Sequence, residues 1–387
     1  MTTPQQTERS LWLAPDGWSV EIIDQTILPH EVQIARLCSV EDAARAIVTM
    51  QVRGAPLIGV TAAYGMALAL RADASDQSLW AADALLRDTR PTAVNLGWAL
   101  DEMRVRVQPL SPSERVSAAY ARAAELVEED VAANRAIGEH GLGVFRSLLS
   151  AKPPGEPLRI LTHCNAGRLA TVAWGTATAP MYLAHESGLP IHVWVSETRP
   201  RNQGAALTAW ELGKRGVPLT VIADSAAGHL IQRCLVDVVI VGADRVTAHG
   251  DVANKIGTYL KALAAHAHRV PFYVALPGTT IDWAIQDGIM QIPIERRDAH
   301  EVTHVIGAAG SGRCEEVRLT PAETPARNDA FDVTPAALVT GLITERGVCA
   351  ASSTGLKQLF PEASKASEAG LRVQGPASKS LPDTVAV

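Results

Sequence analysis

Cys164 is the residue of this chain whose type and position most strongly suggest chemistry. It lies in the stretch LRILTHCNAGRLATVAWGTA, where a short β-type run ends near Thr162 and a helical pattern of small residues follows. We therefore expect the thiol at the carboxyl end of a buried strand and at the amino end of the next helix. Small ligands of open α/β sheets gather at that edge, and a helix N-terminus lowers the pKa of a thiol.

Asp244 is the second candidate, because it directly follows the strongly hydrophobic run VDVVIVG. Burial there would raise the pKa of its carboxyl group toward the range of a general acid or base, unless Arg245 forms an ion pair with it and lowers that pKa. A buried aspartate that caps the next turn explains the local sequence equally well. The residues by themselves leave both interpretations open.

Polar residues suited to binding a ligand lie in two further segments of the second half of the chain. Asn254 and Lys255 precede a predicted helix in HGDVANKIG, where an amide, an ammonium group and free backbone N–H groups suit phosphate oxygens. Gln203 lies in the loop after the second strand of the second half of the chain. A helix cap beside a solvated lysine is the competing interpretation of the Asn254–Lys255 pair.

Two irregular segments of the first half each place an arginine beside a helix-breaking residue. Arg53 lies in VRGAP and Arg90 in TRPTAVN, in each case just before a helix resumes. Arginine binds phosphate with a planar fork, although an exposed arginine is usually only a solvated charge. The chain has neither a GxGxxG dinucleotide motif after the first strand nor a GxxxxGK[ST] phosphate loop, so the pattern predicts no nicotinamide site.

The predicted secondary structure that must position these residues changes near residue 151, from helices alone to alternating strands and helices. Alanine-rich helical periodicity runs from about Ser39 to Leu148, and the segment AKPPG then reads as a domain boundary. After it, β-branched runs at LRILT, IHVWV, LTVIA, VDVVIV and PFYVA alternate with stretches long enough for helices. The sequence predicts an α/β protein with a mainly helical domain over 1–150, a Rossmann-like parallel-sheet domain over 156–355 and a flexible tail over 361–387.

Composition narrows the classes of function. The formal net charge is −6, which gives no basic surface for nucleic acid, and no apolar run approaches the roughly 20 residues that span a bilayer. We expect a cytoplasmic protein that binds neither nucleic acid nor membrane.

The five cysteines form no CxxC pair and no metal-ligand spacing, so we expect no disulfide or metal site. Apart from Cys164, we expect small core residues at Cys38, Cys234, Cys314 and Cys349.

Several motifs together resemble the methylthioribose-1-phosphate isomerase family, whose superfamily includes the regulatory subunits of translation initiation factor 2B. The resemblance covers roughly residues 11–348 in one order. The motifs that carry it are MQVRGAPLIGVTAAYG, RPTAVNLGWAL, THCNAGRLAT, ETRPRNQGAALTAWEL, the run from VGADR to GTTID, IPIERR and FDVTPAALVTGLITERGV.

The resemblance implies an enzyme that converts 5-methylthioribose 1-phosphate into 5-methylthioribulose 1-phosphate in methionine salvage. It implies a homodimer, a small sugar phosphate as substrate and no metal or organic cofactor. It places the catalytic thiol at Cys164 and the acid/base carboxyl group at Asp244. The substrate contacts that it implies are Arg53, Gly54, Ala55, Arg90, Gln203, Asn254 and Lys255.

The chain departs from the usual family pattern at a few positions, such as Ala166, where the family commonly has threonine. These departures leave the breadth of substrates open, including a 5-deoxyribose 1-phosphate. A ribose-1,5-bisphosphate isomerase would need a second cationic pocket, whereas a methylthio group needs apolar walls, for which Val52, Pro56 and Trp98 are candidates. A regulatory subunit without catalysis is the least favoured alternative, because a scaffold needs no thiol facing a carboxyl group.

Overall fold

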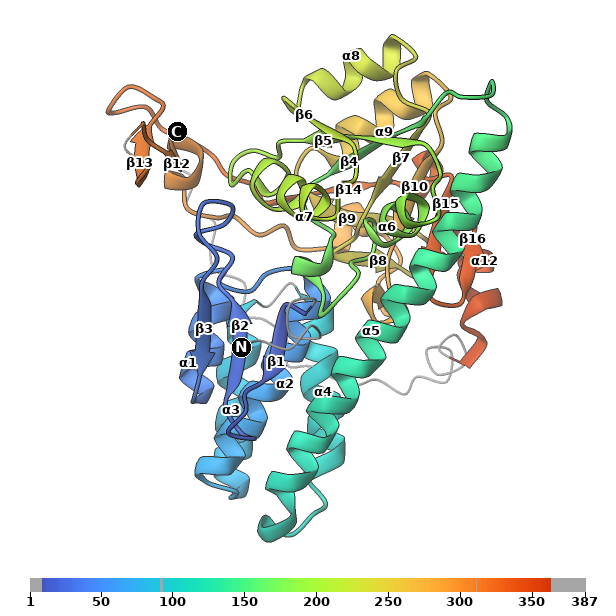
Figure 1. The fold of residues 1–387 in the computed structure, drawn as a ribbon. Coiled ribbons are helices and arrows are strands. Elements are labelled where there is room, and N and C mark those ends of the chain that lie inside the picture. Colours follow the sequence, from blue (N-terminus) through green and yellow to red (C-terminus); the bar gives the residue numbers. More distant parts are fainter. Residues whose placement is uncertain (1–8, 91–92, 311, 363–387) are drawn as a thin grey trace.

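The computed structural model describes residues 9–90, 93–310 and 312–362. Its first part is a helical bundle with a small sheet on one side (Figure 1). The elements are β1 (Leu11–Leu13), β2 (Val20–Ile23), β3 (Ile34–Leu37), α1 (Val40–Val48), α2 (Ala55–Ala72), α3 (Asp76–Thr89), α4 (Val94–Val107) and α5 (Pro112–Ser150). The antiparallel sheet β1–β2–β3 is absent from the sequence prediction, because its strands are short.

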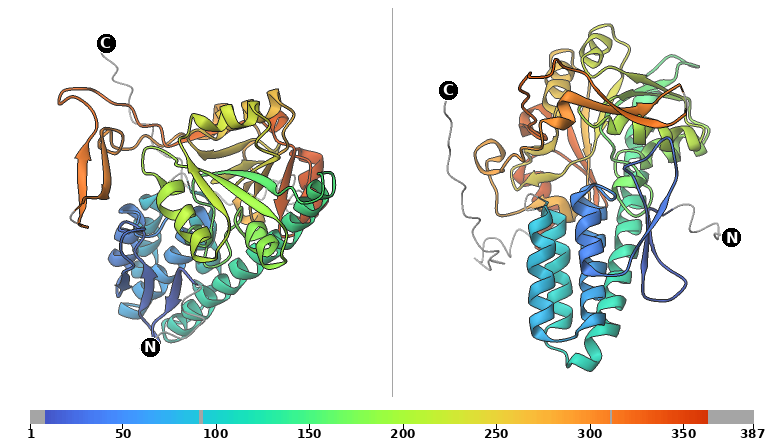
Figure 2. Two further views of the ribbon diagram at one scale, coloured as in Figure 1. Left: turned by 45° about the horizontal axis from the view of Figure 1, so that its top comes forward. Right: turned by 90° about the vertical axis from the view of Figure 1, so that its left-hand side faces the viewer.

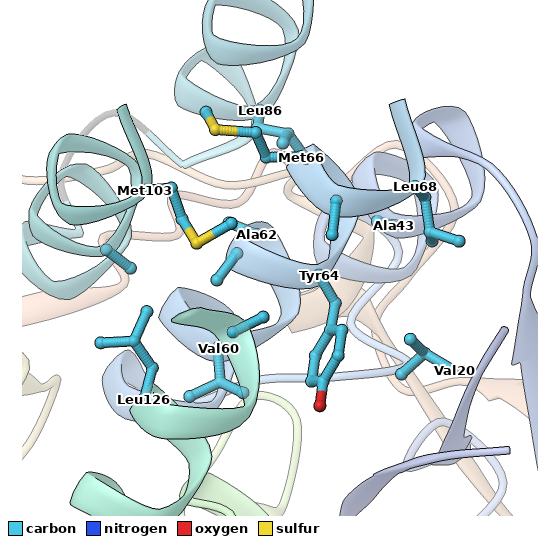
Figure 3. Packing of buried hydrophobic residues seen from close by; sticks show 14 of the residues in the cluster. Val20, Ala43, Val60, Ala62, Tyr64, Met66, Leu68, Leu86, Met103 and Leu126 are labelled. Carbon is cyan, nitrogen blue, oxygen red and sulfur yellow. The ribbon is translucent and has the colours of Figure 1, made fainter. Parts of the chain in front are cut away.

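Helix α2 is the centre of the first core. Among the described residues it alone is long and apolar enough to span a membrane by length and composition, but 83% of that window is buried inside the protein. Figure 3 shows Val60, Tyr64 and Met66 of α2 among side chains of the surrounding elements. The expectation that no apolar run approaches such a length is therefore wrong for α2, whose apolar surface is used in packing.

The second part is a seven-stranded sheet covered by helices on both faces (Figure 1). In spatial order its strands are β16 (Gly347–Cys349), β15 (Gly341–Thr344), β10 (Phe272–Ala275), β7 (Val238–Val241), β4 (Leu158–His163), β5 (Ile191–Ser196) and β6 (Leu219–Ile222). All neighbours are parallel except the β15–β16 pair. The predicted α/β class and all five predicted strands are confirmed, and β15 and β16 are additional.

Successive side chains of a strand point to opposite faces of the sheet and pack into two separate cores. Val238 and Ile240 of β7 pack on one face with α5, α6 and α7, whereas Val239 and Val241 pack on the other face with α8, α9 and α12. The helices of these layers are α6 (Ala179–Glu186), α7 (Ala209–Lys214), α8 (Ala226–Gln232), α9 (Thr258–Ala267) and α12 (Ser353–Leu359).

The order of the parallel strands sets the place of the site. Numbered along the chain, they lie in the order 3-2-1-4-5-6, so the connections from the neighbours β4 and β7 leave in opposite directions. A crevice opens at the carboxyl ends of two such strands. Cys164 follows β4 directly, and Asp244 follows β7 after two small residues. The topology therefore brings both residues to this crevice.

Smaller elements extend beyond the main sheet. They are the sheet β11 (Ile281–Asp282), β8 (Arg245–Thr247), β9 (Val252–Lys255) and β14 (Phe331–Thr334), the helices α10 (Gly288–Gln291) and α11 (His300–Thr303), and the hairpin β12 (His304–Ala308) and β13 (Cys314–Arg318). The hairpin projects from the body of the molecule, as Figure 1 and the left view of Figure 2 show.

Helix α5 runs along both parts (Figure 1), with Ala119 in the first core and Phe145 in the second. Domains over 1–150 and 156–355 therefore stay a prediction. Residues 363–387 of the predicted tail lie outside the described residues. Cys38, Cys234 and Cys314 are exposed, so the expectation of core residues is wrong for these three, whereas Cys349 is half-buried and packs against one core of the second part.

Candidate active site

One cavity at the crevice is lined by residues from both parts of the chain. It contains about 670 Å³ of empty space, part of which is open solvent. All nine residues singled out from the sequence line it, namely Arg53, Gly54, Ala55, Arg90, Cys164, Gln203, Asp244, Asn254 and Lys255. The tertiary fold thus assembles residues that are up to about 200 positions apart in the chain.

The backbone of Cys164 is held in an unusual conformation. Its φ is +62°, a left-handed value that is uncommon for a residue with a side chain. The amide of Cys164 donates a hydrogen bond to Thr198 Oγ1 at 2.8 Å, and Thr208 Oγ1 donates one to the Cys164 carbonyl oxygen at 2.7 Å. Two threonines from the neighbouring loop and helix therefore fix the direction in which the thiol leaves the strand.

The expectation that Cys164 begins a helix is wrong. Only a single 3₁₀ turn, Arg168–Ala170, follows it, and the next α-helix starts at Ala179. Desolvation by burial is the main influence on the thiol and raises its pKa, against the smaller lowering effects of Arg53 and Lys255. The thiol is therefore protonated at neutral pH, in contrast to the low-pKa nucleophile that a helix N-terminus would produce.

Asp244 has an environment of the same kind. Desolvation by burial raises the pKa of its carboxyl group, and the nearby charges of Lys255, Arg90 and Arg53 only partly offset this effect. Arg245 instead forms an ion pair with Asp282, with Nη1 and Oδ2 3.2 Å apart. No described residue donates a hydrogen bond to the Asp244 carboxyl group. The raised pKa favours the protonated form, which is the form of a general acid.

Cationic groups converge on the cavity from three elements. The Arg53 guanidinium is buried and donates to Asn165, while Lys255, on strand β9, donates from Nζ to the Ala330 carbonyl oxygen at 2.9 Å. Arg90 Nε lies 3.3 Å from Glu295 Oε2. Together they provide a binding environment for an anion.

The remaining lining residues have other roles. Gln203 is 5% exposed, and its Oε1 has no hydrogen-bond partner among the described residues, so a donor on a ligand would satisfy it. Gly54 has a φ of +93°, and a Cβ there would lie 2.5 Å from Ala170, so only glycine lets α2 begin this close to the loop after β4. Of the proposed apolar walls, Pro56 lines the cavity, whereas Val52 and Trp98 do not.

Comparisons with known proteins show the family of this chain. The model of the Initiation factor 2 subunit family matches residues 51–351. A methylthioribose-1-phosphate isomerase of Rhodospirillum centenum is 62% identical over 354 residues, which span 92% of this chain and 94% of that protein. One of Brucella anthropi is 60% identical over 94% of this chain and 100% of that protein. The chain belongs to the methylthioribose-1-phosphate isomerase family.

Solved structures agree with this membership. The crystal structure of 5-methylthioribose 1-phosphate isomerase from Pyrococcus horikoshii is 39% identical, with a TM-score of 0.78 over 93% of this chain and 98% of that one. A structure described as the delta subunit of translation initiation factor eIF-2B from A. fulgidus is 38% identical, with a TM-score of 0.74 over 92% and 99%. The curated relatives at about 60% identity are isomerases, so membership makes this chain an isomerase.

Four residues that hold the cavity side chains in place were not singled out from the sequence. Asn165 holds Arg53, Thr198 and Thr208 hold Cys164, and Glu295 pairs with Arg90. All four lie inside the motifs that carried the family resemblance, but a hydroxyl or amide in a loop has no distinctive spacing. Only the folded contacts distinguish these residues from ordinary surface polar groups.

Proposed function

We propose that this isomerase converts 5-methylthioribose 1-phosphate into 5-methylthioribulose 1-phosphate, with Cys164 and Asp244 as its catalytic pair. The main support is one observation: a thiol and a carboxyl group, both with raised pKa values, line the same cavity as three cationic side chains. The names of the relatives supply the substrate.

Substrate binding is assigned to the charged and amide side chains. We assign the phosphate to Arg53, Lys255 and Arg90, since each carries a positive charge to the cavity. The amides of Gln203 and Asn254 then bind sugar hydroxyl groups, and the apolar walls formed by residues such as Met50, Pro56 and Phe331 receive the methylthio group.

The chemistry begins with an acid step, because a sugar phosphorylated at C1 is locked as a ring acetal. Protonated Asp244 gives its proton to the ring oxygen, and the bond between that oxygen and C1 breaks. Hydrogen then moves from C2 to C1 with its electron pair, which leaves a protonated ketone at C2. The C2 hydroxyl proton passes to the Cys164 sulfur while the thiol gives its own proton to the Asp244 carboxylate, so both groups regain their starting state.

The raised pKa of Cys164 supports this hydride route over an enolate route. A protonated thiol is a poor base toward a carbon-bound hydrogen, but it can relay a proton between two oxygen atoms. Turnover in D₂O tests the hydride route: it places no solvent deuterium at C1 of the product, and deuterium found there would contradict it.

A turnover assay tests the proposed substrate. The purified protein is given 5-methylthioribose 1-phosphate, 5-deoxyribose 1-phosphate and ribose 1,5-bisphosphate, and ketose formation is followed for each. We expect the highest kcat/KM for the methylthio substrate. Preference for the bisphosphate would contradict the substrate assignment, and no turnover of any of them by folded protein would contradict the enzyme assignment.

We also propose that the enzyme is a cytoplasmic homodimer. The family resemblance supports the dimer, and a net charge of −6 fits a protein free of nucleic acid. Light scattering on the full chain measures the mass of the particle, and a monomer at micromolar concentration would contradict the homodimer.

A further inference from the structure

The environment of Arg53 raises the question of what fixes its charged group. The side chain is buried, and among the described residues no carboxylate lies within ion-pair distance of its guanidinium. Both of its hydrogen bonds go to one residue: Nη1 donates to Asn165 Oδ1, and Nη2 donates to the Asn165 carbonyl oxygen at 2.6 Å. The position of Arg53 therefore depends on how the Asn165 amide is oriented.

Glu211 sets that orientation. Asn165 Nδ2 donates to Glu211 Oε1, so the amide lies between a guanidinium and a carboxyl group. A guanidinium only donates hydrogen bonds, and both Glu211 carboxyl oxygens face N–H donors and act as acceptors, so the amide fits this place in one orientation. If the amide turned over, its NH₂ group would face Arg53 and its oxygen would face Glu211.

Glu211 is itself held in place on α7. It is 2% exposed, and it also accepts hydrogen bonds from the Leu169 amide at 3.3 Å and from Tyr182 Oη at 3.4 Å. A Cβ on Gly167 would lie 2.5 Å from the Glu211 carboxyl oxygen, so the loop after Cys164 packs directly on this carboxyl group. Nothing in the proposed mechanism uses Glu211, although it is a buried ionisable group beside the site.

The same amide reaches the catalytic thiol by a second branch. Asn165 Nδ2 also donates to Thr208 Oγ1 at 3.1 Å, and Thr208 in turn donates to the Cys164 carbonyl oxygen at 2.7 Å. Each hydrogen bond in this series can run in only one direction, and the Glu211 carboxyl group is the acceptor at its end. One carboxyl group therefore orders both the phosphate-binding arginine and the backbone of the thiol.

We propose that Glu211 is the positioning residue of this site: its carboxylate orients the Asn165 amide, which holds the Arg53 guanidinium and, through Thr208, the Cys164 carbonyl group. The expected effect on KM rests on the proposed assignment of Arg53 to the phosphate.

The variant Glu211→Gln tests this role. A glutamine amide must turn its NH₂ group toward either Asn165 or the Leu169 amide, so one donor always meets another donor. We expect KM for 5-methylthioribose 1-phosphate to rise about ten-fold or more, with a smaller fall in kcat, because the misplaced group is a charged hydrogen-bond donor to the substrate. An unchanged KM in a variant that unfolds cooperatively would overturn the proposal.

A rescue variant that combines Asn165→Asp with Glu211→Gln separates positioning from general damage. The carboxylate introduced at position 165 accepts from both Arg53 and the amide introduced at position 211, while the oxygen of that amide accepts from Leu169, so the donors and acceptors on the Arg53 branch match again. The donation from position 165 to Thr208 is lost in this variant, so the rescue is measured on KM and not on kcat. We expect KM within about three-fold of wild type, whereas Asn165→Asp alone brings two carboxylates together and binds more weakly. A double variant no better than Glu211→Gln would overturn the proposal.

Controls keep this result distinct from the proposed function. Asp237→Asn removes a carboxylate at the far end of the sheet and should leave KM unchanged. If wild-type protein fails to turn over the sugar phosphate, the proposed function is wrong. The five proteins are then compared by the protection that inorganic phosphate gives Cys164 against alkylation; equal protection in wild type and Glu211→Gln would overturn the role of Glu211.

Discussion

Strand β7 has an aspartate at each end, and the two carboxyl groups have opposite properties. Asp237, just before the strand, accepts hydrogen bonds from the Arg159 amide, the Arg159 side chain and Lys152 Nζ, each at 2.7–3.1 Å. Burial opposes ionisation there too, but these partners outweigh it and lower the pKa of Asp237. Asp244, after the strand, has a raised pKa because burial outweighs the nearby charges of Lys255, Arg90 and Arg53.

The difference shows how one strand supports both stability and chemistry. At the amino end, charges are paired within the protein and add to the stability of the fold. At the carboxyl end, Asp244 lines the cavity and accepts no hydrogen bond from a described residue, so its carboxyl group remains available to a ligand. A carboxyl group without internal partners costs stability, and it is useful only where a reaction needs a proton donor.

The largest expected effect is that of Asp244→Asn, which removes the acid while keeping the shape. We expect kcat to fall about 10³-fold, in line with the loss of a general acid, with thermal unfolding close to wild type. Stopped assays on the methylthio substrate measure the rate. Near-normal turnover would remove Asp244 from the mechanism and erase the proposed contrast with Asp237.

Cys164→Ser should have a somewhat smaller effect. A serine hydroxyl can still relay a proton, but it is a weaker acid than a thiol, so we expect kcat to fall about 10²-fold. Alkylation of Cys164 should abolish turnover, substrate should protect the thiol, and no covalent sugar adduct should form. A sugar adduct seen by mass spectrometry would replace the relay with nucleophilic catalysis.

The two ends of β7 should also give pH dependences of opposite sign. Asp244 must be protonated to act, so kcat should decline as pH rises through its raised pKa. Asp237 has a folded-state pKa below its unfolded value, so its contribution to stability is present above the unfolded pKa and disappears as pH falls through the folded one. Rate and unfolding profiles on the same protein measure both, and a kcat that rises through the alkaline range would contradict the acid role.

Asp237→Asn should have the smallest effect on activity. Loss of its partly buried ion pairs should lower the free energy of unfolding by about 1–3 kcal/mol, with kcat/KM unchanged within about two-fold. Denaturant titration and steady-state kinetics measure the two quantities. A large loss of turnover would show that the amino end of the strand also supports the chemistry.

Much of the second part of the fold was predictable because its strands are local hydrophobic runs. The apolar runs LRILT and VDVVIV predict buried strands, and the structure confirms them as β4 and β7. The helix expected after Cys164 was wrong, since small residues fit an irregular loop as well as a helix. The sheet β1–β3 gave no signal, because short strands are stabilised by their neighbours rather than by local sequence.

The candidate site divides in the same way. Residue type and position after a strand were enough to single out Cys164 and Asp244 as chemical candidates, and their roles stay predictions. Neither the type nor the spacing of Asn165, Thr208 and Glu211 distinguished them from structural polar residues. Their relation to Arg53 exists only once α7, the loop after β4 and the start of α2 pack together.

The sequence by itself therefore determined the α/β class, the main strands and which side chains are capable of proton transfer or anion binding. Each of these depends on local hydrophobic pattern or on the chemistry of a single residue. Only the tertiary structure decided that β4 and β7 are neighbours, that the Cys164 and Asp244 pKa values rise, and that Glu211 lies behind Arg53. Desolvation and hydrogen-bond direction depend on groups far apart in the chain, so they exist only in the folded molecule.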